Sequence, residues 1–176
     1  MTQKQKNYIE NNSDLIENED WNKFFQNAPY GTGGIIYECG IDFMRNMEKI
    51  PQRCFLGSDL KIISIPDSVT SIGSSAFEYC KNLTRVIIPD SVTYIAHYAF
   101  QDCHNLISVN FKGTKAQWDA ITKIRSFDKT VMKIICTDGI IELYNYWFII
   151  CGVLNMTTEQ KEYIKQNISK SPRKRK

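Results

Sequence analysis

Long apolar runs are missing from the sequence. The longest nearly apolar stretch, residues 146–154, has nine residues, whereas a membrane-spanning helix needs about 20. The first 20 residues contain neither the apolar segment nor the small-residue cleavage site of an export signal. We therefore expect a cytoplasmic protein with no membrane contact, in which residues 146–154 form a buried strand.

Histidine is scarce, and the cysteines are not clustered. The two histidines, His97 and His104, lie seven positions apart, and the six cysteines include no CxxC pair. These spacings exclude the usual zinc and redox motifs, so we expect free thiols, no metal and no cofactor. Neither histidine has a serine or cysteine nucleophile motif or an acid at a diagnostic spacing. We expect both to be solvated surface residues and the protein not to be an enzyme.

A strong charge excess is also absent from most of the chain. The 22 basic and 19 acidic residues give a net charge of +3, and residues 156–176 hold seven of the basic and two of the acidic ones. Residues 1–155 therefore sum to −2, which is not the charge of a nucleic-acid-binding body. The basic tail, residues 156–176, has three open interpretations: a phosphate-backbone contact, an import signal or a solvated end. Its candidate contacts are Lys170, Arg173, Lys174, Arg175 and Lys176.

What the sequence does contain is a repeat of 23 residues. Residues 60–82 and 83–105 align without a gap and agree at 12 of 23 positions. A partial copy with one residue missing precedes them at residues 50–60, and the first half of another follows at residues 106–111. Such periodicity predicts stacked units, none of which can bury its own apolar face alone.

One unit predicts a short strand followed by a turn. Leu83, Val86 and Ile88 can face inward while Arg85 and Ile87 face outward. Proline at position 89 ends the strand, residues 92–95 form a second extended piece, and Ala99 with Phe100 lies on a short helical turn. Stacking then predicts one internal ladder of Leu60, Leu83 and Leu106, another of Phe55, Phe77 and Phe100, and buried thiols at Cys80 and Cys103.

The repeated pattern Leu-x-x-Ile/Val-x-Ile-Pro-Asp-Ser-Val-Thr-x-Ile-x-x-x-Ala-Phe-x-x-Cys-x-Asn resembles the BspA-type leucine-rich repeat over residues 50–111. FKGTKAQWDAI and KIICTDG look like the ending of short members, with Trp118 as a lid on the last apolar layer. WNKFF and ECGIDFM look like the helical cap of small members from bacterial and bacteriophage genomes. The resemblance implies an α/β fold, a short leucine-rich-repeat solenoid. Its parts are a helical cap (1–49), repeats (50–111), a strand-rich cap (112–155) and the basic tail.

The residues of the amino-terminal section themselves predict helices. Thr2 and Gln5 have the spacing of a capping box, and a second helix is expected to begin near Asp20. The Gly-Thr-Gly-Gly run at residues 31–34 lacks the Lys-Ser/Thr pair of a phosphate-binding loop, so it is predicted to be a plain loop. Gly40 is the expected end of a following helix.

The carboxyl-terminal section repeats the beginning of the chain. Residues 156–167 match residues 1–12 at seven of 12 positions, at an offset of 155. Two interpretations stay open. The similarity is either an accident of gene origin or the mark of a second capping helix.

Two groups of side chains are candidates for binding a partner. The outward positions of the repeat strands are Ile62, Ser64, Arg85, Ile87, Ser108 and Asn110. Apolar groups beside an arginine are typical of interface anchors. A second group, Tyr94, His97 and Tyr98, replaces three serines of the preceding repeat. This second group has an alternative interpretation as ordinary exposed aromatics.

The resemblance implies that the chain binds another protein. We expect an intracellular accessory protein of a bacterium or phage that binds a host or phage protein, in its sharper form an inhibitor of a host defence enzyme. The alternatives are a nucleic-acid-associated factor that uses the basic tail, and a surface adhesin, which the missing export signal disfavours. Fold resemblance does not identify the partner.

Overall fold

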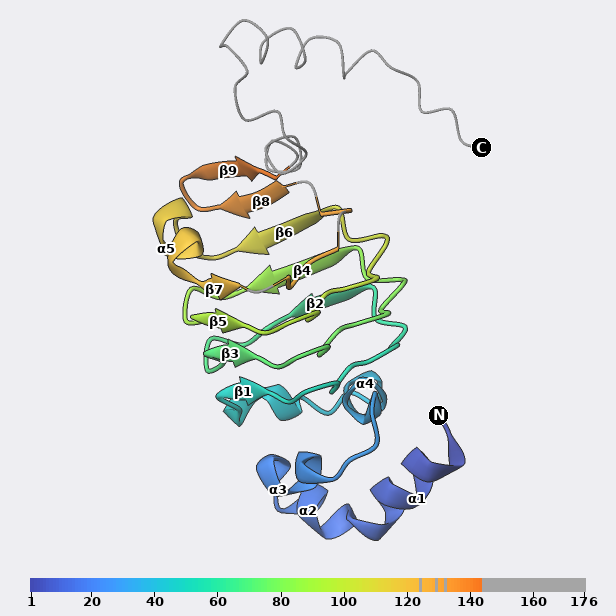
Figure 1. Cartoon of the computed structure of the whole chain (residues 1–176). Helices are drawn as coiled ribbons and strands as arrows, with labels where there is room; N and C mark the ends of the chain where they lie inside the picture. The colour runs from blue at the N-terminus through green and yellow to red at the C-terminus, as the bar shows by residue number, and fades with distance from the viewer. Residues whose placement is uncertain (124, 129, 132, 144–176) are drawn as a thin grey trace, which may run out of the picture. The chain divides into compact units, whose positions relative to one another are not determined.

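The computed structural model describes residues 1–143 except 124, 129 and 132 (Figure 1). The chain divides into two compact units, Met1–Glu142 and Leu143–Lys176. The predictions for residues 146–154 and for the basic tail lie outside the described residues. Within the described residues, no helix combines the length and the apolar character needed to cross a membrane.

The amino-terminal section is helical, as predicted. Thr2 and Gln5 form the reciprocal capping box at the start of the first helix, and the Asp20 side chain accepts a hydrogen bond from the Lys23 N–H at the start of another. Its elements are α1 (Gln3–Asn11), α2 (Ser13–Glu17), α3 (Trp21–Gln26), α4 (Thr32–Glu38) and the 3₁₀ helix η1 (Phe43–Asn46).

The predicted loop at residues 31–34 is wrong, because Thr32 begins α4 and both following glycines lie inside this helix. A Cβ on Gly33 would lie 2.2 Å from Cys54 Sγ, and one on Gly34 would lie 1.9 Å from Ser58 Oγ. The glycines therefore allow α4 to approach the first repeat unit closely, which outweighs their low helix propensity. Gly40 follows the helix end with a φ of 84°, as predicted.

The repeats form stacked coils with two sheets (Figure 1). Sheet A contains β1 (Lys49–Ile50), β3 (Ser71–Ile72), β5 (Tyr94–Ile95) and β7 (Thr122–Lys123). Sheet B contains β2 (Ile62–Ser64), β4 (Arg85–Ile88), β6 (Ser108–Phe111), β8 (Lys133–Cys136) and β9 (Gly139–Glu142). All neighbouring strands are parallel except β8 and β9. The predicted leucine-rich-repeat solenoid is confirmed.

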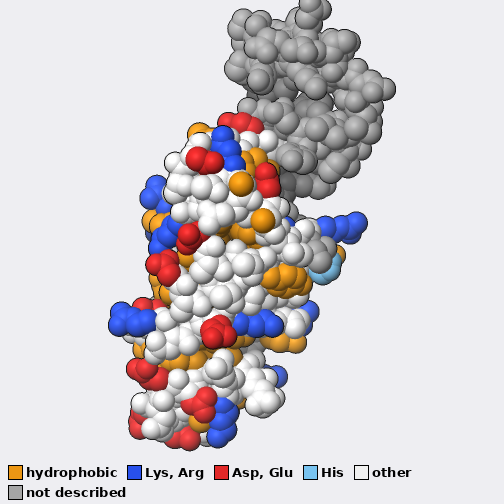
Figure 2. All heavy atoms as spheres, turned by 90° about the vertical axis from the view of Figure 1, so that its left-hand side faces the viewer, with side chains coloured by type: hydrophobic (Ala, Val, Ile, Leu, Met, Phe, Trp, Pro, Cys, Tyr) orange, Lys and Arg blue, Asp and Glu red, His pale blue; other side chains and the backbone are white. Residues whose placement is uncertain are grey.

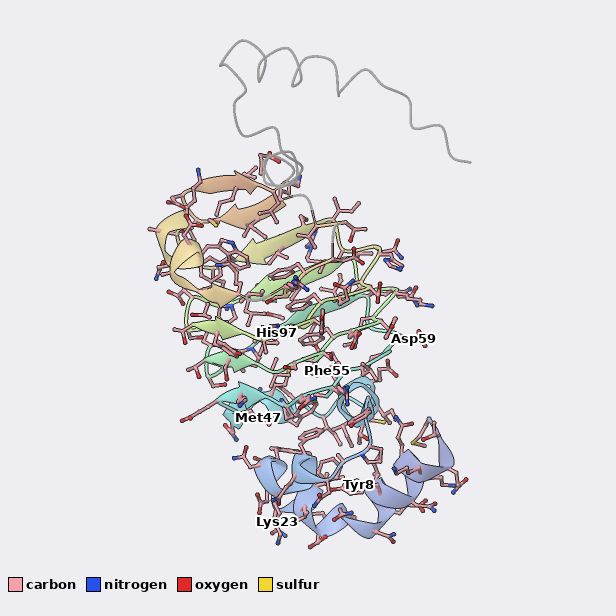
Figure 3. All side chains as sticks on the ribbon, viewed as in Figure 1. Tyr8, Lys23, Met47, Phe55, Asp59 and His97 are labelled. Carbon is pink, nitrogen blue, oxygen red and sulfur yellow. The ribbon has the colours of Figure 1, made fainter. Side chains whose placement is uncertain are left out.

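Identical side chains stack from coil to coil in the core. The ring centroids of Phe55 and Phe77 lie 4.8 Å apart, and those of Phe77 and Phe100 lie 4.9 Å apart with an interplanar angle of 4°. Phe55 lies inside the stack in Figure 3. All three members of the leucine ladder are buried as well. Phe127 continues the phenylalanine ladder at 5.0 Å from Phe100.

The corner before each core phenylalanine is a turn, so the predicted short helical turn is wrong. The backbone enters the left-handed region at Arg53, Ser75, Tyr98 and Arg125. The N–H groups of Ser75 and Tyr98 donate to carbonyls of the next coil at 3.0 Å. In a helical turn, these N–H groups would point along the helix axis and could not reach the next coil. The hydrogen bonds between coils therefore favour the left-handed turn.

The carboxyl end of the coils is covered by α5 (Lys115–Ala120). Thr114 and Gln117 form a second capping box at its start. Trp118 is buried, and its ring lies 5.2 Å from Phe111 and 5.8 Å from Phe127. This position confirms the prediction that Trp118 covers the last apolar layer.

Candidate functional site

The predicted outward strand positions all lie on sheet B. Register places Ile62 beside Arg85, and Ser64 beside Ile87 and then Asn110. The alternation of the strands points these side chains away from the core that Val86 and Ile88 enter. We call this surface the strand face, formed by Ile62, Ser64, Arg85, Ile87, Ser108, Asn110, Lys133, Ile135 and Ile140.

The strand face is wider than the sequence indicated. Lys133 pairs with Ser108, Ile135 pairs with Asn110, and Ile140 on the antiparallel β9 pairs with Ile135. These last three residues were missed because the 23-residue spacing is broken after residue 111. The alternation in KIIC and in GIIE was the signal that could have found them.

Apolar side chains on the strand face are exposed. Ile62 is 54% exposed and Ile140 is 48% exposed, while Ile87 and Ile135 are half-buried between their neighbours. Arg85 is exposed beside them. The surface therefore combines apolar contact area with a basic group that can pair with a carboxylate. The binding role of its residues stays a prediction.

The second predicted group lies on a different sheet. Tyr94 belongs to β5 of sheet A, next to Ser71 and Thr122, and is 39% exposed. His97, labelled in Figure 3, and Tyr98 are exposed on the following corner. Their ring centroids lie 6.0 Å apart. The structure thus brings these three residues together in one coil, but does not join them to the strand face.

Charge is mixed over the side of the unit that Figure 2 shows. Hydrophobic side chains are interspersed there with Lys and Arg and with Asp and Glu, and no field of one sign covers the view. This side therefore does not attract a highly charged ligand over a long distance. A shallow depression at the junction of α3 and β1 is lined by Asp20, Asn22, Lys23, Phe25, Gln26, Lys49 and Pro51.

One polar cluster was missed by the sequence analysis. His104 lies on the surface as predicted, but its Nδ1 is 3.0 Å from Asp128 Oδ2 and its Nε2 is 3.9 Å from Asp102 Oδ1. Asp128 follows His104 by 24 residues, so only the stacking of coils brings the two together. This cluster has the donor types of a cation site, but its members already pair with one another.

The two repeat thiols, Cys80 and Cys103, are buried in the coils. The cysteines at 39, 54, 80, 103 and 136 are free, as predicted, while Cys151 lies outside the described residues. Cys80 Sγ donates to the Phe55 carbonyl and Cys103 Sγ donates to the Phe77 carbonyl, each at 3.0 Å. Burial raises the pKa of Cys80 to about 12 and raises that of Cys103 as well. These thiols stay protonated near neutral pH and are weak nucleophiles.

A family model matches the whole of the repeat section. Residues 38–155 match the family model of the BspA type Leucine rich repeat region, in six copies. Among solved structures, the chain is similar to a leucine rich cell surface protein from Faecalibacterium prausnitzii A2-165, with 39% sequence identity and a TM-score of 0.42. That match covers 43% of this chain and 20% of the other, so the chain spans only a small part of its length. No curated protein matches the chain.

Proposed function

Because the chain belongs to the BspA-type leucine-rich repeat family, we propose that it is a protein-binding module whose partner docks on the strand face. Repeats of this kind are typically non-enzymatic frames that present side chains on a regular backbone. Among the described residues, nothing points to catalysis: both histidines are exposed and the coil-core thiols are protonated. Fold alone does not select a surface.

The observation that supports the strand face is the exposure of isoleucines on an ordered sheet. Two of them are about half exposed, and the stacked core behind the sheet fixes their positions. Burial of such groups under a partner removes apolar area from water, at about 25 cal/mol for each Å². Arg85 lies in their midst, where a partner carboxylate could be held away from solvent.

The size of the strand face limits how the partner can bind. Five strands spaced about 4.8 Å apart and about 13 Å long cover roughly 250 Å². A standard interface buries about 800 Å² on each partner. The partner must therefore also contact neighbouring loops or a cap, so mutation of the strand face should weaken binding without abolishing every contact.

Within this class, we propose an intracellular accessory protein of a bacterium or phage that binds a host or phage protein, with inhibition of a host defence enzyme as the sharpest version. Its support is the resemblance of the amino-terminal section to the helical caps of small family members. A surface adhesin and a nucleic-acid-associated factor are the competing functions. Cell fractionation separates the first of these from the proposal, because an adhesin would be found on the cell surface.

The test of the strand face is a quantitative capture experiment. The wild-type chain and the variant Arg85→Glu with Ile87→Asp are each used to capture partners from the native host, and recovered proteins are quantified by mass spectrometry. Because both substitutions face outward, far-ultraviolet circular dichroism should stay unchanged. The affinity of the purified partner should fall by more than about 2 kcal/mol, or about thirtyfold.

The matched control carries Tyr94→Ser with Tyr98→Ser, which copies the preceding repeat on sheet A. It should bind the recovered partner as tightly as the wild type. A partner lost by the control and kept by the strand-face variant would move the interface to sheet A. If both variants bind normally, the partner does not dock on either sheet.

A further inference from the structure

Helix α1 is held to the rest of its unit by two hydrogen bonds and a contact between aromatic rings, among other contacts. Gln5 Nε2 donates to the Tyr30 carbonyl at 2.9 Å, and Tyr8 OH donates to the Phe24 carbonyl at 2.6 Å. The rings of Tyr8 and Phe24 also meet edge to face, with centroids 5.3 Å apart. Figure 3 labels Tyr8 on the side of α1 that faces α3. No residue of α1 is fully buried, so another segment with the same side chains could compete for this place.

Residues 156–167 carry those side chains. In residues 1–12, four positions are half-buried, namely Gln5, Tyr8, Ile9 and Asn12. All four recur at an offset of 155 as Gln160, Tyr163, Ile164 and Asn167. Of the eight exposed positions, only three have the same residue at this offset. Those three include Met1 and the capping Thr2.

The contacts of α1 show the same difference between half-buried and exposed positions. The capping box uses Thr2 and Gln5, and the contacts with the unit use Gln5 and Tyr8, all of which recur. Two exposed pairs within α1 are lost instead. The Gln3–Asn7 hydrogen bond would join Thr158 to Glu162, and the Lys6–Glu10 ion pair would join Lys161 to Lys165. Similarity is thus concentrated in the positions that cap the helix and contact Phe24 and Tyr30.

We propose that residues 156–167 of a second copy of this chain bind in the place of α1, on the surface formed by Phe24 and Tyr30. The order of the elements favours a second copy. α1 lies beyond β1 at one end of the coils, and the described chain leaves from β9 at the other end (Figure 1). In two copies placed end to end, the β9 end of one would therefore lie beside the helical cap of the next.

Such a contact joins two different surfaces and is therefore heterologous. Heterologous contacts close into rings or continue as open chains of molecules. Association should be weak, because α1 of each copy is tethered beside its own site and competes at a high effective concentration. The expected product in solution is a small fraction of dimers and longer assemblies that grows with protein concentration.

The test is photo-cross-linking in the full chain. Tyr30 is 58% exposed at the edge of the site, and only its backbone carbonyl accepts the bond from Gln5. Tyr30→p-benzoylphenylalanine therefore keeps the site and adds a reactive group beside it. We expect covalent dimers in which position 30 of one chain is linked to residues 156–167 of the other, as identified by mass spectrometry.

Three further variants make the result decisive. Tyr163→Ser should remove the dimers, whereas Glu162→Ala, at a position that matches the exposed Asn7, should keep them. Tyr8→Phe should raise the dimer yield about fivefold, the effect of losing one ordinary hydrogen bond in the competing helix. The proposal is overturned if no dimers form, if Tyr163→Ser leaves them unchanged, or if every link to residues 156–167 lies within one chain.

Discussion

Stacked phenylalanines are the residues on which the coils most depend. Phe77 lies between Phe55 and Phe100 and is fully buried. Phe77→Ala should lower the free energy of unfolding by about 3 to 5 kcal/mol, because the cavity would open in the middle of the ladder. Denaturant melts measure this loss, with Ile62→Ala on the surface as a control that should cost little. A Phe77→Ala protein within about 1 kcal/mol of the wild type would contradict the register of the ladder.

The left-handed corners lead to an opposite expectation for a neighbouring residue. Tyr98 has a φ of 60°, a conformation that costs a side-chain-bearing residue about 1 to 2 kcal/mol and costs glycine nothing. Tyr98→Gly should therefore melt at or slightly above the wild-type temperature. Tyr94→Gly, in the extended strand β5, should melt at a lower temperature. Equal destabilisation by both changes would show that the corner is not strained.

At the scale of elements, the close approach of α4 to the first coil can be tested directly. A Cβ at Gly34 would overlap Ser58 Oγ at 1.9 Å and Ser58 Cβ at 2.7 Å. Gly34→Ala should destabilise the protein by about 1 to 3 kcal/mol, although alanine is the better helix former. Combining Gly34→Ala with Ser58→Gly should recover most of the loss in a thermal melt. Without that recovery, the clash with Ser58 is not the cause.

The elements also show what a single sequence can predict. The strands of the repeat units were predicted correctly. The 23-residue period shows which side chains of β4 and β5 stack on those of the neighbouring units. The helix α4 was missed because its glycines have low helix propensity, and their purpose is contact with Cys54 and Ser58, about 20 residues away. Phe127 was missed because its spacing from Phe100 is 27 residues, and the outward residues of β8 were missed because the 23-residue period no longer applies there.

Candidate binding residues were predictable to a similar extent. The outward direction of Arg85 and Ile87 follows from strand alternation alone. The pairing of His104 with Asp128 does not, because it joins two coils whose connecting segment has no repeat pattern.

At the scale of the whole molecule, the basic tail and the coils should be separable. A chain that ends at Asn155 should keep its melting temperature, because the ladders and both capping boxes lie within residues 1–142, and its net charge should fall from +3 to −2. Differential scanning calorimetry measures the first and isoelectric focusing the second. Aggregation or a clear drop in melting temperature would show that residues 156–176 stabilise the fold.

The same truncation tests the nucleic-acid alternative. Five cations near the end of the chain would release counterions from phosphates, so binding by the full chain should weaken about 10²- to 10³-fold between about 50 and 200 mM salt. Truncation at Asn155 should then abolish it. Salt-insensitive binding kept by the truncated chain would place any nucleic-acid contact on the coils.

The register between the full repeat units is constant, so the number of units could change without any other change in the molecule. Residue 62 pairs with 85 and residue 71 with 94, so each full unit presents the next with the same edge that it received. A gene that gained another copy of residues 83–105 would encode a taller protein whose two ends meet the same neighbours as before. The length of the stack can thus change by whole units in a single genetic step. The protein could then match the height of a partner surface while both of its ends keep their sequences.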